Sequence, residues 1–251
     1  MHALFDLTGK VALVTGSGTG LGAGMARGLA AAGADVILVD RTAPDETADA
    51  VRGSGRKALS LSADLAGLPA IRETVLKGIE AFGRIDILIN NAGIIRRTPA
   101  VEFSEADWDD VMTINAKTVF FMSQEAGRDM MKRKSGKIIN VASLLSFSGG
   151  INVPSYSASK GAVAQITKAL ANEWAQHGLN INAIAPGYMV TNNTANLRKD
   201  PERTRTISER IPAGRWGMPE DLQGAAIFLA SKASDYINGH VLVVDGGWMA
   251  R

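Results

Sequence analysis

Short apolar segments of strand-forming residues alternate with helical patterns along most of the chain, and this alternation limits the fold more than any other feature. Such an alternation produces a parallel sheet, and right-handed crossovers place helices on both of its faces. We therefore predict a Rossmann-like, doubly wound α/β fold with about seven strands. The predicted strands are 11–15, 35–40, 57–62, 85–90, 137–143, 180–185 and 240–245.

The length of 251 residues suits a single catalytic domain over 1–251, because a sheet covered on both faces often reaches this size around one core. Ligands of such sheets bind beyond the carboxyl ends of the strands, near the point where the strand order reverses. The polar segment 188–215 is either a lid over this site or a plain pair of solvated helices. Four residues stand at predicted strand ends: Gly16, Asn90, Ser143 and Pro186.

A glycine-rich loop joins the first predicted strand to an alanine-rich helix over 23–32. Glycines let the backbone approach a pyrophosphate closely, and the helix N-terminus binds it through free N–H groups and its dipole. A flexible loop is the alternative interpretation of the glycines alone. The loop residues predicted to bind a cofactor are Gly16, Ser17, Thr19, Gly20, Leu21 and Gly22.

An aspartate, Asp40, ends the second predicted strand, 20 residues beyond Gly20. A carboxylate at this place accepts hydrogen bonds from the adenosine ribose and repels a 2′-phosphate, which favours NAD over NADP. Arg41 argues weakly the other way, because a guanidinium can bind that phosphate. Asp40 alternatively serves only the turn after the strand. We predict NAD as the cofactor, with NADP as the weaker alternative.

Tyr156 and Lys160 lie four residues apart in a predicted helix, so both side chains share one face. A fixed ammonium favours the phenolate, and we therefore expect Lys160 to lower the pKa of Tyr156 and make the phenol a general acid. The pair alone is also typical of an unrelated helix surface. Its significance increases because Ser143, at a strand end, lies 13 residues upstream.

The order of these motifs resembles that of the short-chain dehydrogenase/reductase family, from about position 9 to 251. The resemblance implies hydride transfer between a nicotinamide cofactor and a carbonyl or alcohol. It rests on the glycine loop, Asn90-Asn91-Ala92-Gly93, Ser143, Tyr156, Lys160 and Pro186-Gly187.

The resemblance also implies a role for each candidate residue. Tyr156 is the acid in ketone reduction and the base in alcohol oxidation, Lys160 adjusts its pKa and holds the nicotinamide ribose, and Ser143 positions the carbonyl oxygen. Asn115 continues a proton relay through water to the lysine. The further cofactor contacts that it implies are Asp64, Leu65, Asn91, Ala92, Gly93, Pro186, Gly187 and Thr191.

Two of these residues have plainer alternatives. Asn115 is otherwise a polar residue that bends its helix, and Asp64 is otherwise a helix cap. Ser104 and the acidic residues after it resemble a capping box, which predicts one long helix from there toward position 134, with Asn115 inside it.

Two arginines, Arg96 and Arg97, follow the Asn-Asn-Ala-Gly stretch, so one of them can grip a substrate carboxylate with paired donors. The alternative is a surface position or an ion pair between subunits. Other short stretches resemble family members that act on deoxy sugar acids in pectin breakdown, and they imply a sugar-acid substrate. The predicted substrate contacts are Arg96, Arg97, Ser143 and Tyr156; the stretches include 103–112, 185–189, 191–194, 211–217 and 245–251.

Three other functions stay open. Reduction of a 3-oxoacyl thioester on acyl carrier protein uses the same fold and catalytic set, although Asp40 disfavours it because such reductases commonly use NADPH. Another sugar or sugar-acid dehydrogenase of the family has the same motifs. A non-catalytic nucleotide-binding regulator is a minor alternative, which the intact catalytic set disfavours.

Composition and charge exclude several classes of partner. A formal net charge of +2 is too small to indicate a nucleic-acid partner, and the chain has no cysteine for disulfides or thiolate metal sites. The histidines at positions 2, 177 and 240 lack metal-ligand spacing, so we expect surface or packing roles and no metal. The absence of a signal pattern and of a long apolar run predicts a cytoplasmic protein without a membrane partner.

Members of the resembled family commonly assemble as tetramers through the helix around Asn115 and the helix after Tyr156. Trp248, near the end of the chain, offers a further apolar anchor. We therefore expect a homotetramer with two-fold symmetry.

Overall fold

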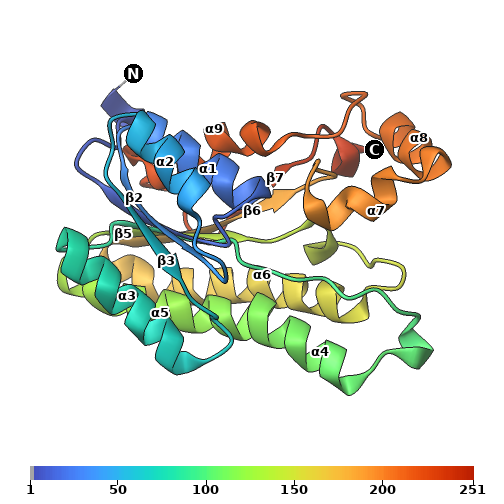
Figure 1. Ribbon diagram of the computed structural model, residues 1–251, viewed down its shortest axis with the longest axis horizontal. Helices are drawn as coiled ribbons and strands as arrows, with labels where there is room; N and C mark the ends of the chain where they lie inside the picture. Colours follow the sequence, from blue (N-terminus) through green and yellow to red (C-terminus); the bar gives the residue numbers. More distant parts are fainter. Residues whose placement is uncertain (1–2) are drawn as a thin grey trace.

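Each predicted strand is present in the computed structural model, which describes residues 3–251 (Figure 1). His2, expected to be a surface or packing residue, lies outside the described residues. The seven strands form one all-parallel sheet in the order β3-β2-β1-β4-β5-β6-β7. They are β1 (Val11–Thr15), β2 (Asp35–Asp40), β3 (Ala58–Ser62), β4 (Ile87–Asn90), β5 (Gly136–Val141), β6 (Leu179–Pro186) and β7 (Val241–Val244).

The sheet reverses its strand order between β1 and β4. From β1 the chain builds outward through β2 to β3, then crosses back and builds through β4 to β7 on the other side. The carboxyl ends of β1 and β4 therefore border the crevice where doubly wound sheets bind ligands. The predicted fold class is confirmed.

Helices cover both faces of the sheet, as Figure 1 shows. Alternate residues of β1 explain why: Ala12 and Val14 belong to one buried cluster, and Val11 and Leu13 to the other. Both faces are apolar, which accounts for the continuous apolar run in the sequence. One face carries α1 (Gly20–Ala31), α2 (Asp45–Gly53) and α9 (Gln223–Ala230); the other carries α3 (Leu68–Phe82), α4 (Glu105–Met112), α5 (Thr118–Lys132) and α6 (Pro154–Trp174).

The single long helix predicted from Ser104 toward position 134 is wrong in one respect. A π-helical segment, η3 (Thr113–Lys117), interrupts it between α4 and α5. The N–H of Thr118 bonds to the carbonyl of Thr113, five residues back, so the backbone widens around Asn115. The predicted cap is present, because the Ser104 hydroxyl accepts the N–H of Asp107 at 3.1 Å.

The polar segment 188–215 leaves the sheet after β6 and contains two helices, α7 (Ala195–Arg198) and α8 (Pro201–Arg210) (Figure 1). Its base is pinned, since Gly217 N–H donates to the Tyr188 carbonyl at 2.9 Å and Val190 N–H to the Gly217 carbonyl at 2.8 Å. Its own apolar cluster consists of Ile207, Ile211 and Trp216, with Tyr188, Val190, Leu197 and Trp248 packed against them.

Short 3₁₀ turns complete the chain. They are η1 (Ala3–Phe5), η2 (Ala100–Glu102), η4 (Leu144–Ser146), η5 (Ala175–His177), η6 (Asn192–Thr194), η7 (Pro219–Leu222), η8 (Lys232–Ser234) and η9 (Trp248–Ala250). Two of them matter for the site, because η4 follows Ser143 and η6 follows Thr191.

Candidate active site

The glycine loop is fastened to the end of β4. The Thr15 hydroxyl accepts the N–H groups of Asn91 and Ala92, both at 3.0 Å, and the Asn91 side chain donates to the carbonyls of Thr15 and Gly16. Gly16 has φ +64°, and a Cβ there would lie 2.8 Å from the Ala92 Cα; a Cβ on Gly22 would lie 2.1 Å from the Gly16 carbonyl oxygen. Both positions therefore require glycine.

The first turn of α1 is open to an anion. Thr19 is the N-cap residue but makes no side-chain capping bond, so it does not occupy the N–H groups of the first turn. Ser17, predicted to bind the cofactor, is fully buried, and its hydroxyl donates to the Val39 carbonyl at 3.3 Å. Its side chain therefore holds the loop to β2.

Asp40 reaches back from the end of β2 to the glycine loop. One carboxylate oxygen accepts the N–H of Gly18 at 2.9 Å, and the other accepts the N–H of Arg41 at 2.7 Å. The negative charge of Asp40 therefore lies at the edge of the glycine loop, between two backbone N–H donors. The Arg41 side chain is exposed and has no protein partner among residues 3–251.

The structure brings Ser143, Tyr156 and Lys160 together. The side chains of Ser143 and Tyr156 are hydrogen-bonded to each other, and the Lys160 Nζ lies 5.6 Å from the centre of the Tyr156 ring. Lys160 is only 4% exposed, and its Nζ donates to the Val141 carbonyl at 2.6 Å. The η4 turn is tied to α6, because the Ser146 hydroxyl donates to the Lys160 carbonyl.

The expected direction of the Tyr156 pKa is wrong. Burial raises the pKa of Tyr156, while the hydrogen bond with Ser143 and the charge of Arg97 oppose that rise. Burial also lowers the pKa of Lys160 to about 8. The expectation considered only the nearby ammonium, whereas desolvation of the phenol itself, which disfavours the charged phenolate, is the largest effect on its pKa.

Asn115 anchors the stretch that follows β4. Its side-chain oxygen accepts the N–H of Ile94 at 2.8 Å, and its amide nitrogen donates to the Ile94 carbonyl at 2.9 Å and to the Ser159 hydroxyl at 3.1 Å. The side chain is fully buried. The polar groups of the Asn115 side chain are therefore occupied in holding Ile94 and α6, whereas the relay role stays a prediction.

The two arginines that sequence alone did not separate have different partners. Arg96 forms ion pairs with Asp107 at 3.1 Å and Asp110 at 3.3 Å, both on α4. Arg97 has no acidic partner among residues 3–251; one Nη donates to the Asn193 carbonyl at 3.0 Å. The charge of Arg97, and not that of Arg96, acts to lower the pKa of Tyr156.

A cleft of about 410 Å³ joins most of these residues. It runs from the glycine loop and the end of β2 to Tyr156 and Lys160. The predicted residues that line it are Gly16, Thr19, Gly20, Leu21, Asp40, Arg41, Asp64, Leu65, Asn91, Ala92, Gly93, Arg96, Tyr156, Lys160 and Thr191.

Seven other predicted residues do not line this cleft: Ser17, Gly22, Arg97, Asn115, Ser143, Pro186 and Gly187. Pro186 and Gly187 end β6 beside β7, where Gly187 N–H donates to the Val244 carbonyl at 2.9 Å. Sequence reasoning missed several lining residues, although most are neighbours of predicted ones. They are Val39, Ala63, Ala66, Ile94, Asp110, Ile114, Val141, Asn192 and Asn193.

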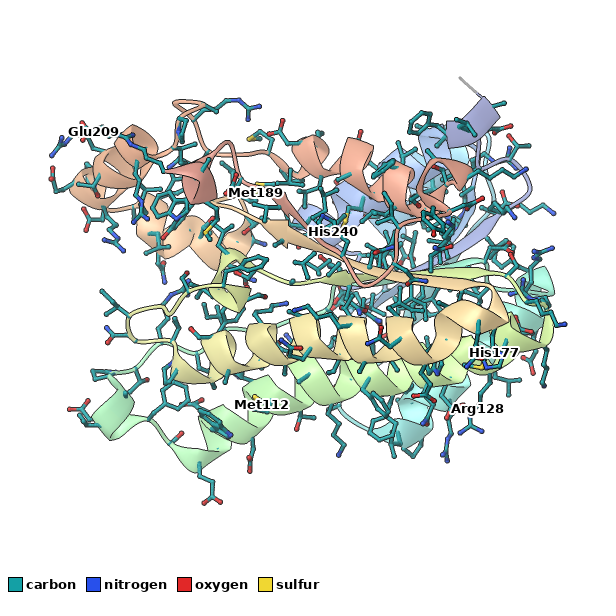
Figure 2. All side chains as sticks on the ribbon, turned by 180° about the vertical axis from the view of Figure 1, so that it is seen from behind. Met112, Arg128, His177, Met189, Glu209 and His240 are labelled. Carbon is teal, nitrogen blue, oxygen red and sulfur yellow. The ribbon has the colours of Figure 1, made fainter. Side chains whose placement is uncertain are left out.

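A larger cavity, of about 670 Å³, lies between the amino ends of the strands and contains no predicted site residue. His177 ends η5 and His240 immediately precedes β7; both are exposed, and Figure 2 shows them apart. Among residues 3–251, no cluster of His, Cys, Asp and Glu side chains could hold a metal ion. No helix in this part of the chain is long and apolar enough to cross a membrane.

Comparison with known proteins agrees with this geometry. A protein-family model described as "Enoyl-(Acyl carrier protein) reductase" matches residues 16–249. The 2-dehydro-3-deoxy-D-gluconate 5-dehydrogenase of Dickeya dadantii is 60% identical over 248 residues, which cover 98% of each protein. The chain belongs to the short-chain dehydrogenase/reductase family. The predicted family is confirmed, and the chain is an oxidoreductase.

Solved structures of short-chain dehydrogenase/reductase proteins have nearly the same fold. One, from Agrobacterium tumefaciens, contains bound NADP; it is 55% identical, has a TM-score of 0.94 and is matched over 99% of both chains. Another is a gluconate 5-dehydrogenase from Burkholderia cenocepacia in complex with NADP and tartrate. It is 42% identical, with a TM-score of 0.95, and is matched over 99% of this chain and 98% of its own.

The residues of this short-chain dehydrogenase/reductase fit a nicotinamide dinucleotide. The close approach of Gly16 to Ala92 leaves no room for a Cβ, and the first turn of α1 offers backbone donors for a pyrophosphate. Asp40 and Arg41 stand at the end of the cleft opposite Tyr156 and Lys160. A nicotinamide cofactor therefore belongs in this cleft, and the relatives leave the choice between NAD and NADP to experiment.

Proposed function

We propose that this protein transfers a hydride between NAD(H) and a keto or hydroxy group of a deoxy sugar acid. The specific activity that we propose is that of a 2-dehydro-3-deoxy-D-gluconate 5-dehydrogenase, also described as 2-deoxy-D-gluconate 3-dehydrogenase, in the breakdown of pectin or uronates. Similarity over 98% of the chain to a relative of the first name supports this activity. The structural observation that carries the proposal is the Arg97 guanidinium, which has no acidic partner among residues 3–251, uses one Nη on the Asn193 carbonyl, and has a charge that lowers the pKa of Tyr156.

Arg97 is the carboxylate-binding arginine in this proposal. Its guanidinium has five N–H donors, and only one contact, to the Asn193 carbonyl, uses them. The remaining donors form a planar fork that matches a carboxylate. Arg96 already contacts two aspartates of α4, so we assign it a positioning role instead of a substrate contact.

The proposed proton transfer follows from the burial of Tyr156. A raised pKa keeps the phenol protonated at neutral pH, which suits donation of its proton to a ketone oxygen. Ser143, hydrogen-bonded to Tyr156, would hold that oxygen, and in alcohol oxidation Tyr156 would take the proton back. When bound, the nicotinamide supplies or accepts the hydride.

NAD preference is part of the proposal and depends on the Asp40 carboxylate. Two backbone N–H groups hold this carboxylate where it would meet the adenosine ribose, so its charge opposes a 2′-phosphate. Arg41, whose side chain has no partner in the described part of the chain, supports some use of NADP. Bound NADP in the Agrobacterium tumefaciens relative makes a comparison of both cofactors essential.

A homotetramer and a lid complete the proposal. The outer face of α4, α5 and α6, which Figure 2 shows with Met112 labelled, has a shallow depression lined by Met112, Phe120, Phe121 and Ile166. Two-fold pairing of this face would bury its aromatic rings. A monomer found by light scattering at micromolar concentration would contradict the assembly. The lid assignment for 188–215 is supported by Thr191, Asn192 and Asn193, which line the cleft.

A substrate panel with two matched variants tests the proposed activity. The parent should reduce 3-deoxy-2,5-dioxohexonate with NADH and oxidise 2-keto-3-deoxygluconate in reverse. Arg97→Ala should lower kcat/KM for this substrate about ten- to a hundred-fold, because a charge-assisted bond is lost, and should affect a neutral ketone much less. Arg96→Ala is the control for the charge change, and its effect should not depend on the substrate carboxylate.

Two results would contradict the proposal. If Arg97→Ala does not discriminate between charged and neutral substrates, or if only Arg96→Ala does, the assignment of the carboxylate to Arg97 fails. If 2-keto-3-deoxygluconate and 2-deoxygluconate are both inert with either cofactor, the sugar-acid activity fails. Turnover of a 3-oxoacyl thioester by NADPH would then favour the acyl carrier protein reductase, and inertness toward every ketone would favour a regulator.

A further inference from the structure

The lid segment contacts the stretch after β4 through a single arginine. Within residues 3–251, the hydrogen bond from Arg97 to the Asn193 carbonyl is the one polar contact between 191–210 and the stretch after β4. The Thr194 hydroxyl also donates to the Met189 carbonyl at 2.7 Å, at the base of the segment, and the bonds of Ser208 with Trp216 and of Glu209 with Arg251 lie near its other end. Release of the Arg97 contact would therefore leave the lid without a hydrogen bond to the stretch after β4 and held only at its base.

Arg97 extends from a fixed base. Asn115 holds both backbone groups of Ile94, and Arg96 is paired with Asp107 and Asp110 on α4. The stretch before Arg97 is thus tied to the helical layer at two points. Its guanidinium can act as a bridge, because one end of the contact is fixed and the other end, Asn193, belongs to the first turn of the lid.

We propose that Arg97 is shared between the substrate carboxylate and the lid, so that a carboxylated substrate holds the lid closed and a neutral one does not. This inference rests on the proposed function. One Nη of Arg97 continues to donate to the Asn193 carbonyl, and the remaining N–H donors of the planar guanidinium bind the carboxylate. The bound carboxylate neutralises the charge of the guanidinium and fixes its orientation. The hydrogen bond from Arg97 to the Asn193 carbonyl is strengthened as a result. Substrate selection then includes lid closure as well as direct binding.

Amide hydrogen exchange over 191–199 measures this coupling without relying on turnover. The samples are the NADH-bound parent, Arg97→Ala and Arg203→Ala, each alone, with 2-keto-3-deoxygluconate, or with its uncharged methyl ester. Arg203 is the matched control because it is a lid arginine whose side chain has no partner among the described residues. Arg97→Lys keeps the charge without the fork and provides a second variant.

The proposal predicts that 2-keto-3-deoxygluconate slows exchange in the parent and in Arg203→Ala by about five-fold, the effect of one added hydrogen bond, whereas the ester does not. Arg97→Ala should exchange faster than the parent without ligand and gain no protection from the acid. Arg97→Lys should gain little.

Equal ligand-free exchange in Arg97→Ala and the parent would overturn the bridge. Turnover of 2-keto-3-deoxygluconate by the parent without protection of 191–199 would overturn its sharing with substrate. If the acid is neither bound nor turned over, the proposed function fails and the shared role fails with it. The ligand-free comparison still decides whether Arg97 holds the lid.

Discussion

Lys160 should make the cofactor-free protein less stable at neutral pH than at alkaline pH. Burial lowers the pKa of this amine from 10.5 to about 8. Below pH 8 both states bind the proton, and folding then carries the full cost of burying the ammonium. Between pH 8 and 10.5 the unfolded chain binds more protons than the folded one, so stability rises with pH. The full cost is about 3 kcal/mol, of which about 2 kcal/mol is recovered between pH 7 and 9.5.

Lys160→Met isolates this effect, because it keeps the length of the side chain and removes the amine. It also leaves the Val141 carbonyl without its donor, but that loss does not depend on pH. Relative to the variant, the parent should therefore gain about 2 kcal/mol between pH 7 and 9.5, or roughly 4–8 °C in Tm. Tyr156 is present in both proteins, so its titration largely cancels from the difference.

The assay is urea or thermal unfolding of both cofactor-free proteins at pH 7.0, 8.0 and 9.5. Protein concentration and ionic strength are held constant, because assembly and screening both affect stability. A parent-to-variant difference that stays constant within about 0.5 kcal/mol over this range would refute the reasoning, since no ammonium would then be desolvated on folding.

Three further substitutions test other parts of the site. Tyr156→Phe removes one hydroxyl and little volume, so turnover should fall by about 10²- to 10⁴-fold at unchanged Tm and cofactor affinity; activity within a few-fold of the parent would exclude Tyr156 as the acid. Asp40→Ala should narrow the ratio of kcat/KM for NADH over NADPH, and a parent that is faster with NADPH at equal concentration would contradict the NAD assignment. Gly22→Ala would place a Cβ 2.1 Å from the Gly16 carbonyl oxygen, so cofactor Kd, measured by titration, should rise sharply.

The strands and the glycine loop could be predicted because local sequence determines them. The β1 residues are apolar on both faces, since each face packs against helices, and this produces a run that needs no alternation. Gly16 and Gly22 are required by contacts within one strand, loop and helix unit and its immediate neighbour. Such short-range requirements can be recognised in the sequence because the residues involved are close together in the chain.

The parts that sequence did not predict depend on partners distant in the chain. Arg96 and Arg97 are adjacent and chemically identical, and only the position of α4 gives the first its acidic partners and leaves the second without one. The π-helical turn at Asn115 likewise reflects bonds to Ile94, on the stretch after β4. Asn193 lines the cleft because of the path that segment 188–215 takes after β6. None of these distances follows from local spacing.

The difference in burial between Lys160 and Arg97 gives these two cationic residues different functions in the site. Lys160 is desolvated, so part of its charge is lost near pH 8 in the cofactor-free protein, and its amine is held by a strand-end carbonyl. Arg97 is exposed and keeps its charge, since a guanidinium does not deprotonate in proteins. The lysine is therefore suited to act on the phenol once a ligand fills the cleft, because the ligand changes the surroundings of the amine. The arginine is suited to attract and orient an anion before the cleft closes.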